Sequence, residues 1–209
     1  MSVNTDFAET EADPRQINLT RFDIRLSEKR NFFLDGASFF NFGLEGRRTE
    51  APSGKLSPFF SRRMGLDTTG ASIPINYGAK LTGRINKWDV GVLHISENRD
   101  FGTSYSSVAR VSRNIAQHSS IGVIATYGNA FGESRNAVAG MDLNLATYEF
   151  MGDKRLAFIL YGIHSSTKEM HGNDTSWGAM FTYRNDFLNL RIGHQQIGEN
   201  FFAGLGFVP

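Results

Sequence analysis

The stretch NAVAGMDLNLATYEF‑MGDKR‑LAFILYGIHSST, residues 136–167, decides the fold. In its first part Ala139, Met141 and Leu143 alternate with small or polar residues. Successive side chains of a strand point to opposite faces of a sheet, so this alternation predicts a strand with one apolar face. A polar turn at 151–155 leads into a second apolar run. The stretch predicts a β-hairpin whose strands could cross a bilayer, which takes ~9–11 tilted residues.

Similar segments follow one another along most of the chain. We predict strands near 77–86, 89–97, 104–114, 119–128, 136–149, 156–166, 176–184 and 187–197. Short connections at 87–88, 116–118, 151–155 and 185–186 alternate with longer ones at 98–103, 129–135 and 168–175. Outer-membrane barrels have short turns on one side and longer loops on the other. A soluble β-sandwich also alternates its faces, but its strands are usually only ~5–6 residues long. The predicted fold is therefore an all-β, antiparallel up-and-down transmembrane β-barrel.

Composition narrows the function classes. Among 209 residues there are 18 Phe and 22 Gly but 5 Pro, which suits tightly packed β-structure. The net charge of +1 gives no electrostatic reason to expect nucleic acid as a partner. Cysteine is absent, which excludes disulfides, thiolate catalysis and Cys-ligated zinc. The sequence contains no run of 18 apolar residues, so we predict no transmembrane helix.

The chain divides into two parts. Residues 1–70 are irregular and plug-like, with a candidate strand at 17–26, and residues 71–209 form the meander. The opening MSVNTDFAETEADPRQ has no apolar region typical of a signal peptide. For an outer-membrane protein this predicts a mature or excised piece.

The polar face of the predicted strands would line a lumen. The candidates for binding there are Lys80, Arg84, Arg110, Asp142, Asn144 and Arg191. Strand 156–166 is apolar on both faces, so we expect its inner face to pack against the Phe-rich segment 31–42.

Five motifs occur in order: NTDFAETEADPRQINLTRF, EKRNFFLDGASFFNFG, FFSRRMGL, IPINYGAKLTGR and NFFAGLGFVP. They resemble the barrel region of a bacterial outer-membrane family of unknown function. Members of that family carry an N-terminal sandwich resembling carbohydrate-binding family nine. Relatives favour Pro at the positions of Ser27 and Asn31. The resemblance implies an internal fragment, with the sandwich before it and more strands after it, located in the outer membrane of a Gram-negative bacterium. It implies no catalytic residue.

Arg62 and Arg63, with the run Glu28–Arg30, suggest two alternatives. They could form a constriction that selects anionic solutes, since the fork of Arg suits carboxylate and phosphate. They could instead fasten an inward-folded segment to the wall. The aromatic cluster Phe32, Phe33, Phe39 and Phe40 likewise could stack on sugar rings, or could be the apolar underside of a plug.

Aromatic residues near strand ends are typical of the girdles of membrane barrels: Tyr77, Trp88, Tyr127, Tyr148 and Trp177. The five His residues are dispersed without metal-ligand spacing, so we predict no metal site. The chain also lacks a GxSxG motif and a phosphate-binding loop. We predict no enzyme and no cofactor.

The function expected from these patterns is passive passage or surface binding of a solute, linked to saccharides, by an outer-membrane β-barrel. The alternative is a soluble sandwich-like binding or structural module of a carbohydrate-active protein. The expected partners are outer-membrane lipid and a small solute or saccharide, together with a second copy or missing flanking strands that would cover open sheet edges.

Overall fold

The computed structural model describes residues 2–3, 27–44, 56–67, 71–132, 134–168, 170 and 172–209. The candidate strand at 17–26 lies outside these residues, as do residues 45–55.

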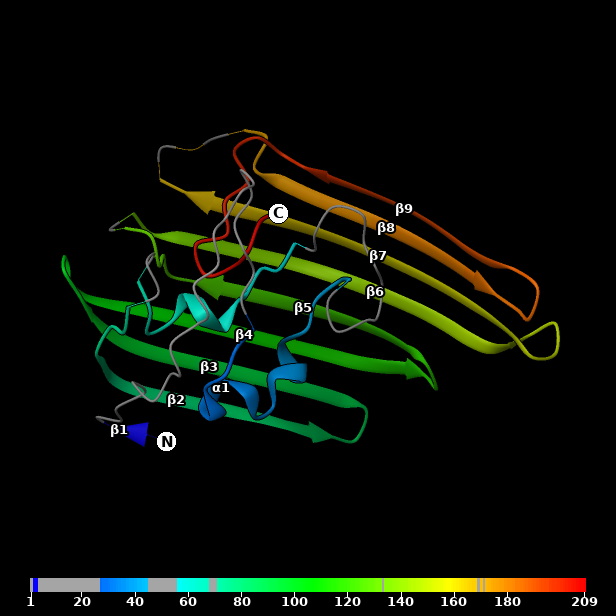
Figure 1. The fold of residues 1–209 in the computed structure, drawn as a ribbon, viewed down its shortest axis with the longest axis horizontal. Coiled ribbons are helices and arrows are strands. Elements are labelled where there is room, and N and C mark those ends of the chain that lie inside the picture. Colours follow the sequence, from blue (N-terminus) through cyan, green and yellow to red (C-terminus); the bar gives the residue numbers. More distant parts are fainter. Residues whose placement is uncertain are drawn as a thin grey trace.

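One antiparallel sheet dominates the fold (Figure 1). Its strands follow one another in chain order, so it is an up-and-down meander, and all eight predicted strands are confirmed. The strands are β1 (Ser2–Val3), β2 (Ile75–Ile85), β3 (Trp88–Arg99), β4 (Gly102–Ala116), β5 (Ser119–Tyr127), β6 (Asn136–Phe150), β7 (Lys154–Thr167), β8 (Thr175–Arg184) and β9 (Asn189–Ile197).

The predicted alternation of short and long connections fails at one place. The connections at 86–87, 117–118, 151–153 and 185–188 are short, and those at 128–135 and 168–174 are longer. The expected long loop between β3 and β4 is instead a tight turn at 100–101. The ladder continues to the pair Arg99 and Gly102, and Gly102 takes a φ of 109° that other residues rarely adopt.

Short helical turns lie against one face of the sheet, which we call the inner face. They are α1 (Asn31–Leu34), η1 (Ala37–Phe40) and η2 (Ser61–Arg63). They belong to residues 27–44 and 56–67, which together with 198–209 we call the inner segments (Figure 1). Gly36, with a φ of 65°, provides the left-handed residue that joins α1 to η1.

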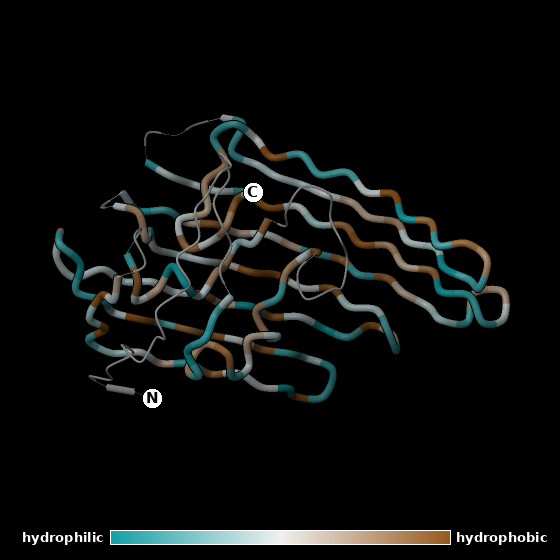
Figure 2. The backbone as a smooth tube through the Cα atoms, viewed as in Figure 1, coloured by the Kyte–Doolittle hydropathy of each residue, from teal (hydrophilic) through white to brown (hydrophobic). Residues whose placement is uncertain are grey.

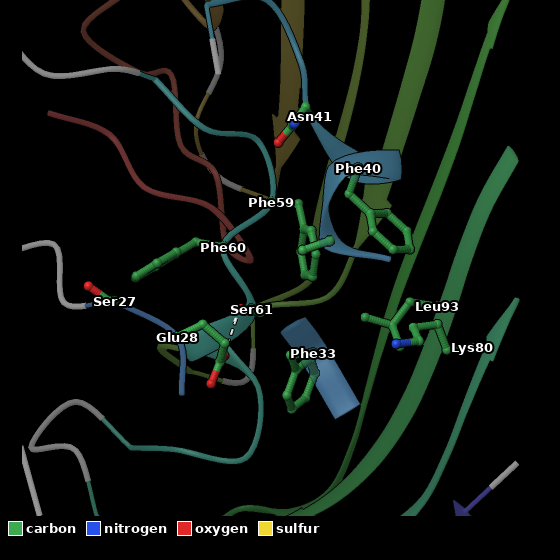
Figure 3. Close-up of a pocket in the computed structure, with 11 residues that line it drawn as sticks. Ser27, Glu28, Phe33, Phe40, Asn41, Phe59, Phe60, Ser61, Lys80 and Leu93 are labelled. Atoms are coloured by element: carbon green, nitrogen blue, oxygen red, sulfur yellow. Dashed lines mark hydrogen bonds between the residues drawn. The ribbon is translucent and has the colours of Figure 1, made fainter. Parts of the chain in front are cut away.

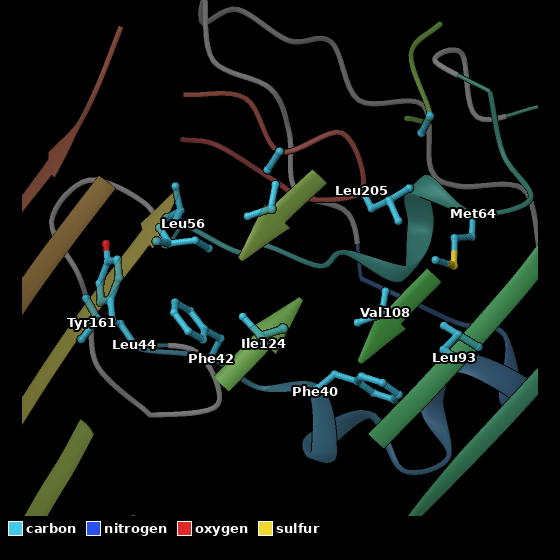
Figure 4. Close-up of a cluster of buried hydrophobic side chains, with 14 of the residues drawn as sticks. Phe40, Phe42, Leu44, Leu56, Met64, Leu93, Val108, Ile124, Tyr161 and Leu205 are labelled. Atoms are coloured by element: carbon cyan, nitrogen blue, oxygen red, sulfur yellow. The ribbon is translucent and has the colours of Figure 1, made fainter. Parts of the chain in front are cut away.

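The hydrophobic core lies between the inner segments and the sheet (Figure 4). Phe40, Phe42 and Leu44 from one inner segment belong to the same buried cluster as Val108, Ile124 and Ile159 of the strands. The Phe42 ring meets the Tyr161 ring edge to face, with centroids 5.7 Å apart. This contact is the packing that we expected between segment 31–42 and the inner face of strand 156–166.

The described strands do not close into a barrel. Within them β9 pairs only with β8, and β1 and β9 form the two edges of the sheet. Closure of eight strands leaves an interior that is just filled by the strands' own side chains. Here the inner segments occupy that space with Phe33, Phe40, Phe42 and Met64, all buried. A sheet curved around these segments is too wide to close with eight strands.

Candidate functional site

A buried ion pair on the inner face holds the backbone of an inner segment. Arg110 on β4 and Asp142 on β6 lie 2.6 Å apart, with side-chain exposures of 5% and 11%. Arg110 donates from Nε to the carbonyl of Asn41, and Asp142 accepts from the N–H of Gly43. The two charges therefore clamp one loop between them, while the Arg110 guanidinium also lies over the Phe42 ring.

Two glycines of the sheet make room for large inner side chains. A Cβ at Gly122 would lie 2.6 Å from the Arg110 guanidinium, and one at Gly178 would lie 2.5 Å from the Tyr161 ring. With any other residue at these positions, the Arg110 guanidinium or the Tyr161 ring would have to shift. Gly178 on β8 is paired with Tyr161 on β7, and the missing side chain leaves room for the Tyr161 ring. That ring in turn packs against Phe42.

A second buried ion pair holds the second inner segment, residues 56–67. Glu97 and Arg99 on β3 lie 2.5 Å apart and are 0% and 5% exposed at the side chain. Glu97 accepts from the N–H of Gly65, and Arg99 donates to the carbonyls of Arg63 and Ala130. Buried charges are costly unless paired and hydrogen-bonded, and here the ion pair and three bonds to backbone groups compensate them, although Nε of Arg99 is buried without a partner.

Lys80 on β2 fastens the first inner segment at the edge of the sheet. Its ammonium donates to the carbonyls of Phe32 and Asp35 and lies 4.9 Å from the centre of the Phe32 ring. The Asp35 carboxylate lies 3.6 Å away and is largely exposed.

The cluster of Glu28 and Arg30 joins the first two inner segments to each other. Glu28 accepts from Arg30 and from the Ser61 hydroxyl, and Arg30 donates to the carbonyls of Met64 and Ser61. Burial by itself would raise the pKa of Glu28. The hydrogen bonds and charge of Arg30, with the Ser61 hydroxyl, outweigh burial and lower that pKa to about 2.

Asn136 and Ser165 fasten the last inner segment. The Asn136 amide donates to the carbonyl of Phe202 and accepts from the N–H of Gly204, and it is fully buried. Ser165 accepts from the N–H of Phe202. This segment also pairs with the second one through Ser57 and Phe207.

The opposite, outer face of the sheet is apolar and uncovered by the described residues. Leu81, Val123, Met141 and Ile192 are 68%, 51%, 58% and 60% exposed. We call these residues, with Val92, Leu145, Phe158 and Leu160 on the same face, the outer band. Along the strands in Figure 2, hydrophobic and hydrophilic residues alternate as this arrangement requires.

Aromatic side chains border the outer band at both ends of the strands. At the end with the longer connections, the His94 ring lies between Tyr77 and Tyr105, with centroids 5.9 Å and 6.1 Å away, and Trp177 lies against His194. At the other end, Trp88 lies beside the Arg113 guanidinium, and His118 meets Tyr148 with centroids 4.3 Å apart. Tyr127, Trp177 and Tyr148 are exposed.

The predicted site residues separate into three groups. Arg62, which donates to the carbonyl of Ser27, and Arg63, which donates to the carbonyl of Gly206, contact inner segments, as do Lys80, Arg110 and Asp142. Arg84, paired with Asp89, and Arg191 are exposed near the short-turn ends of β2 and β9. Phe32, Phe33, Phe39 and Phe40 lie at the interface between the first inner segment and the sheet, where Phe32 meets Phe33 edge to face.

Sequence reasoning missed Glu97, Arg99 and Asn136. All three lie on inner-face positions at strand ends. The predicted strand 89–97 stopped two residues before Arg99, and Glu97 and Asn136 fell within predicted strands but were given no role. The signal that could have found the first two is a pair of opposite charges two residues apart, since such residues share a face with the apolar Leu93 and Ile95.

Neither a metal centre nor a membrane-spanning helix is found in the described part of the chain. It contains no group of three or more His, Cys, Asp or Glu residues that could hold a metal ion. None of its helical turns, of three or four residues each, is long enough to cross a membrane. His171 lies outside the described residues.

Residues 1–98 match a family model described as a domain of unknown function, DUF5916. The match covers the first two inner segments and extends through most of β3, and four of the five motifs quoted above fall within it. No curated protein and no solved structure matches the chain.

Proposed function

We propose that the chain is part of the wall of an outer-membrane β-barrel, with the inner segments filling the space that the wall encloses. The outer band carries this proposal. Monomeric soluble proteins rarely expose apolar patches beyond ~300–600 Å², whereas the outer band runs across β2 to β9. Lipid would cover such a face.

The dimensions of the sheet support a membrane location. Its long strands contain between 9 and 15 residues, and a tilted membrane strand needs ~9–11. Aromatic rings border the outer band at both strand ends, where the two lipid interfaces would lie. The resemblance to an outer-membrane family supports the same location in a Gram-negative bacterium.

The inner face supports a structural use of its charges. Arg110, Asp142, Glu97 and Arg99 are nearly inaccessible and bind backbone groups of the chain. Arg62 and Arg63 also donate to inner-segment carbonyls. We therefore favour the interpretation that these charges fasten the inner segments to the sheet over an anion-selective constriction. The function that we propose is passive, non-catalytic passage of a solute through the space that the inner segments leave open. A link to saccharides rests on the resemblance alone.

The two tryptophans provide a test of the membrane location. Trp88 and Trp177 are the only tryptophans and lie at opposite ends of the outer band. In vesicles of brominated lipid, Trp88→Phe and Trp177→Phe each leave one fluorophore. We expect each remaining tryptophan to be quenched more by bromine near the headgroup than by bromine near the chain ends.

A third variant calibrates the depth of a tryptophan in the bilayer. Trp88→Phe/Trp177→Phe/Met141→Trp places the only indole in the middle of the outer band, where bromine near the chain ends should quench best. A chain that stays monodisperse without detergent, and whose tryptophans no brominated lipid quenches, would contradict the proposal. It would favour the soluble binding module, in which water or another protein covers this face.

A further inference from the structure

A cavity of about 360 Å³ lies between the first two inner segments and the sheet (Figure 3). Its walls are mostly apolar: Phe33, Ala37, Phe40, Phe59, Phe60 and Leu93. Ser27, Glu28, Asn41, Ser61 and Lys80 complete the lining. Pockets of ~300–1,000 Å³ with aromatic walls and a few polar groups are typical small-molecule sites.

The charges of this cavity are compensated within the protein. The Glu28 carboxylate accepts from the Arg30 side chain, from two backbone N–H groups and from the Ser61 hydroxyl. The Lys80 ammonium donates to two carbonyls and lies near the Asp35 carboxylate. A charged ligand would lose its hydration without gaining an unused countercharge, so the cavity favours an uncharged one.

Two polar side chains of the lining remain available. Neither the amide of Asn41 nor the hydroxyl of Ser27 has a hydrogen-bond partner among the described residues, and both are exposed. The Asn41 amide both donates and accepts, and a hydroxyl can do either. In Figure 3 Asn41 and Ser27 lie on different sides of the cavity, with the phenyl rings between them.

We propose that this cavity binds a small, uncharged aromatic compound that carries one or two hydroxyl groups. Its ring would pack edge to face or offset against Phe33, Phe40 and Phe59, as aromatic pairs prefer. Its hydroxyl groups would bond to Asn41 and Ser27. A sugar fits less well, because hydroxyls all round its ring would lose water against Phe and Leu walls. The inner side of the sheet forms this site, so it does not depend on what covers the outer band.

The test uses the full 209-residue chain, refolded in detergent, and 4-hydroxybenzyl alcohol as the probe. Saturation-transfer NMR gives the dissociation constant for wild type and for Ala37→Phe, which fills the cavity from an exposed position without removing a hydrogen bond. We expect this variant to lose saturable binding. Ala116→Phe, an exposed change at the far end of β4, is the matched control and corrects for partitioning into micelles.

A second variant tests the polar contact. Asn41→Leu should weaken binding about three- to tenfold through the loss of a hydrogen bond, and it keeps the proposal testable if Ala37→Phe does not fold. Methyl β-D-glucopyranoside and 4-hydroxybenzoate, one a sugar and one charged, should bind much more weakly. The proposal is overturned if the filled and wild-type cavities give equal signals, or if the glucoside or the benzoate binds as tightly as the probe.

Discussion

Glu28 shows at the scale of one residue how the inner segments depend on an ionised carboxylate. Its folded pKa of about 2 lies below the ordinary value of 4.5, so between these values the unfolded chain binds more protons. Stability from this group is therefore complete above pH 4.5 and is lost as the pH falls toward 2. We expect Glu28→Gln, which cannot ionise, to show a smaller loss of stability across this range.

Urea unfolding in detergent, followed between pH 5 and 2.5, measures the difference. Glu149→Gln provides the matched control, because Glu149 is exposed on β6 and lies outside the cluster. Its stability should follow the wild-type pH profile. Equal profiles for Glu28→Gln and wild type would mean that the contacts with Arg30 and Ser61 contribute little to folding.

The pair of Arg110 and Asp142 allows a second prediction. Removal of one partner leaves a buried, uncompensated charge, which typically costs about 3–5 kcal/mol. Arg110→Met should therefore destabilise the fold by about that amount, and Arg110→Met/Asp142→Asn should recover part of the loss. The free energies of unfolding of the four proteins form a double-mutant cycle. If the destabilisation of the double variant equals the sum of the destabilisations by Arg110→Met and Asp142→Asn, the two side chains act separately.

At the scale of elements, the eight strands could be predicted because period-two alternation is a local property of the sequence. Leu81, Val123 and Met141 identify the apolar face of their strands without any knowledge of the neighbours. The Phe-rich segment could also be assigned to the inner face of β7, because a strand that is apolar on both faces needs a second partner.

Other features of the elements depend on contacts between distant residues. The turn at 100–101 is short because β3 continues through Glu97 and Arg99, whose partners Gly65 and Arg63 come from an inner segment. No local pattern indicates that pairing. The same holds for Gly178, whose role follows from the Tyr161 ring on the neighbouring strand. Lys80, Arg110 and Asp142 lie on the inner face, but the backbone groups that they bind could not be predicted from the sequence.

At the scale of the whole molecule, the inner segments determine how far the sheet can curve. Eight strands that closed alone would leave no room for Phe40, Phe42 and Met64 inside them. One edge of the sheet is formed by β2 with its short partner β1, and the other edge is β9. We therefore expect these two edges to remain apart in the refolded chain and to need further strands or a second copy for closure.

Spin labels can test this expectation, because the chain has no cysteine of its own. Leu81→Cys/Ile192→Cys places labels on the outer faces of β2 and β9. Leu81→Cys/Val92→Cys labels two residues that face each other in the register of β2 and β3, and it defines the short distance of paired strands. In monomers in detergent, pulsed electron paramagnetic resonance should give a clearly longer distance for the first pair. Equal distances would mean that the chain closes by itself, and the inner segments would then have to leave the space between the strands.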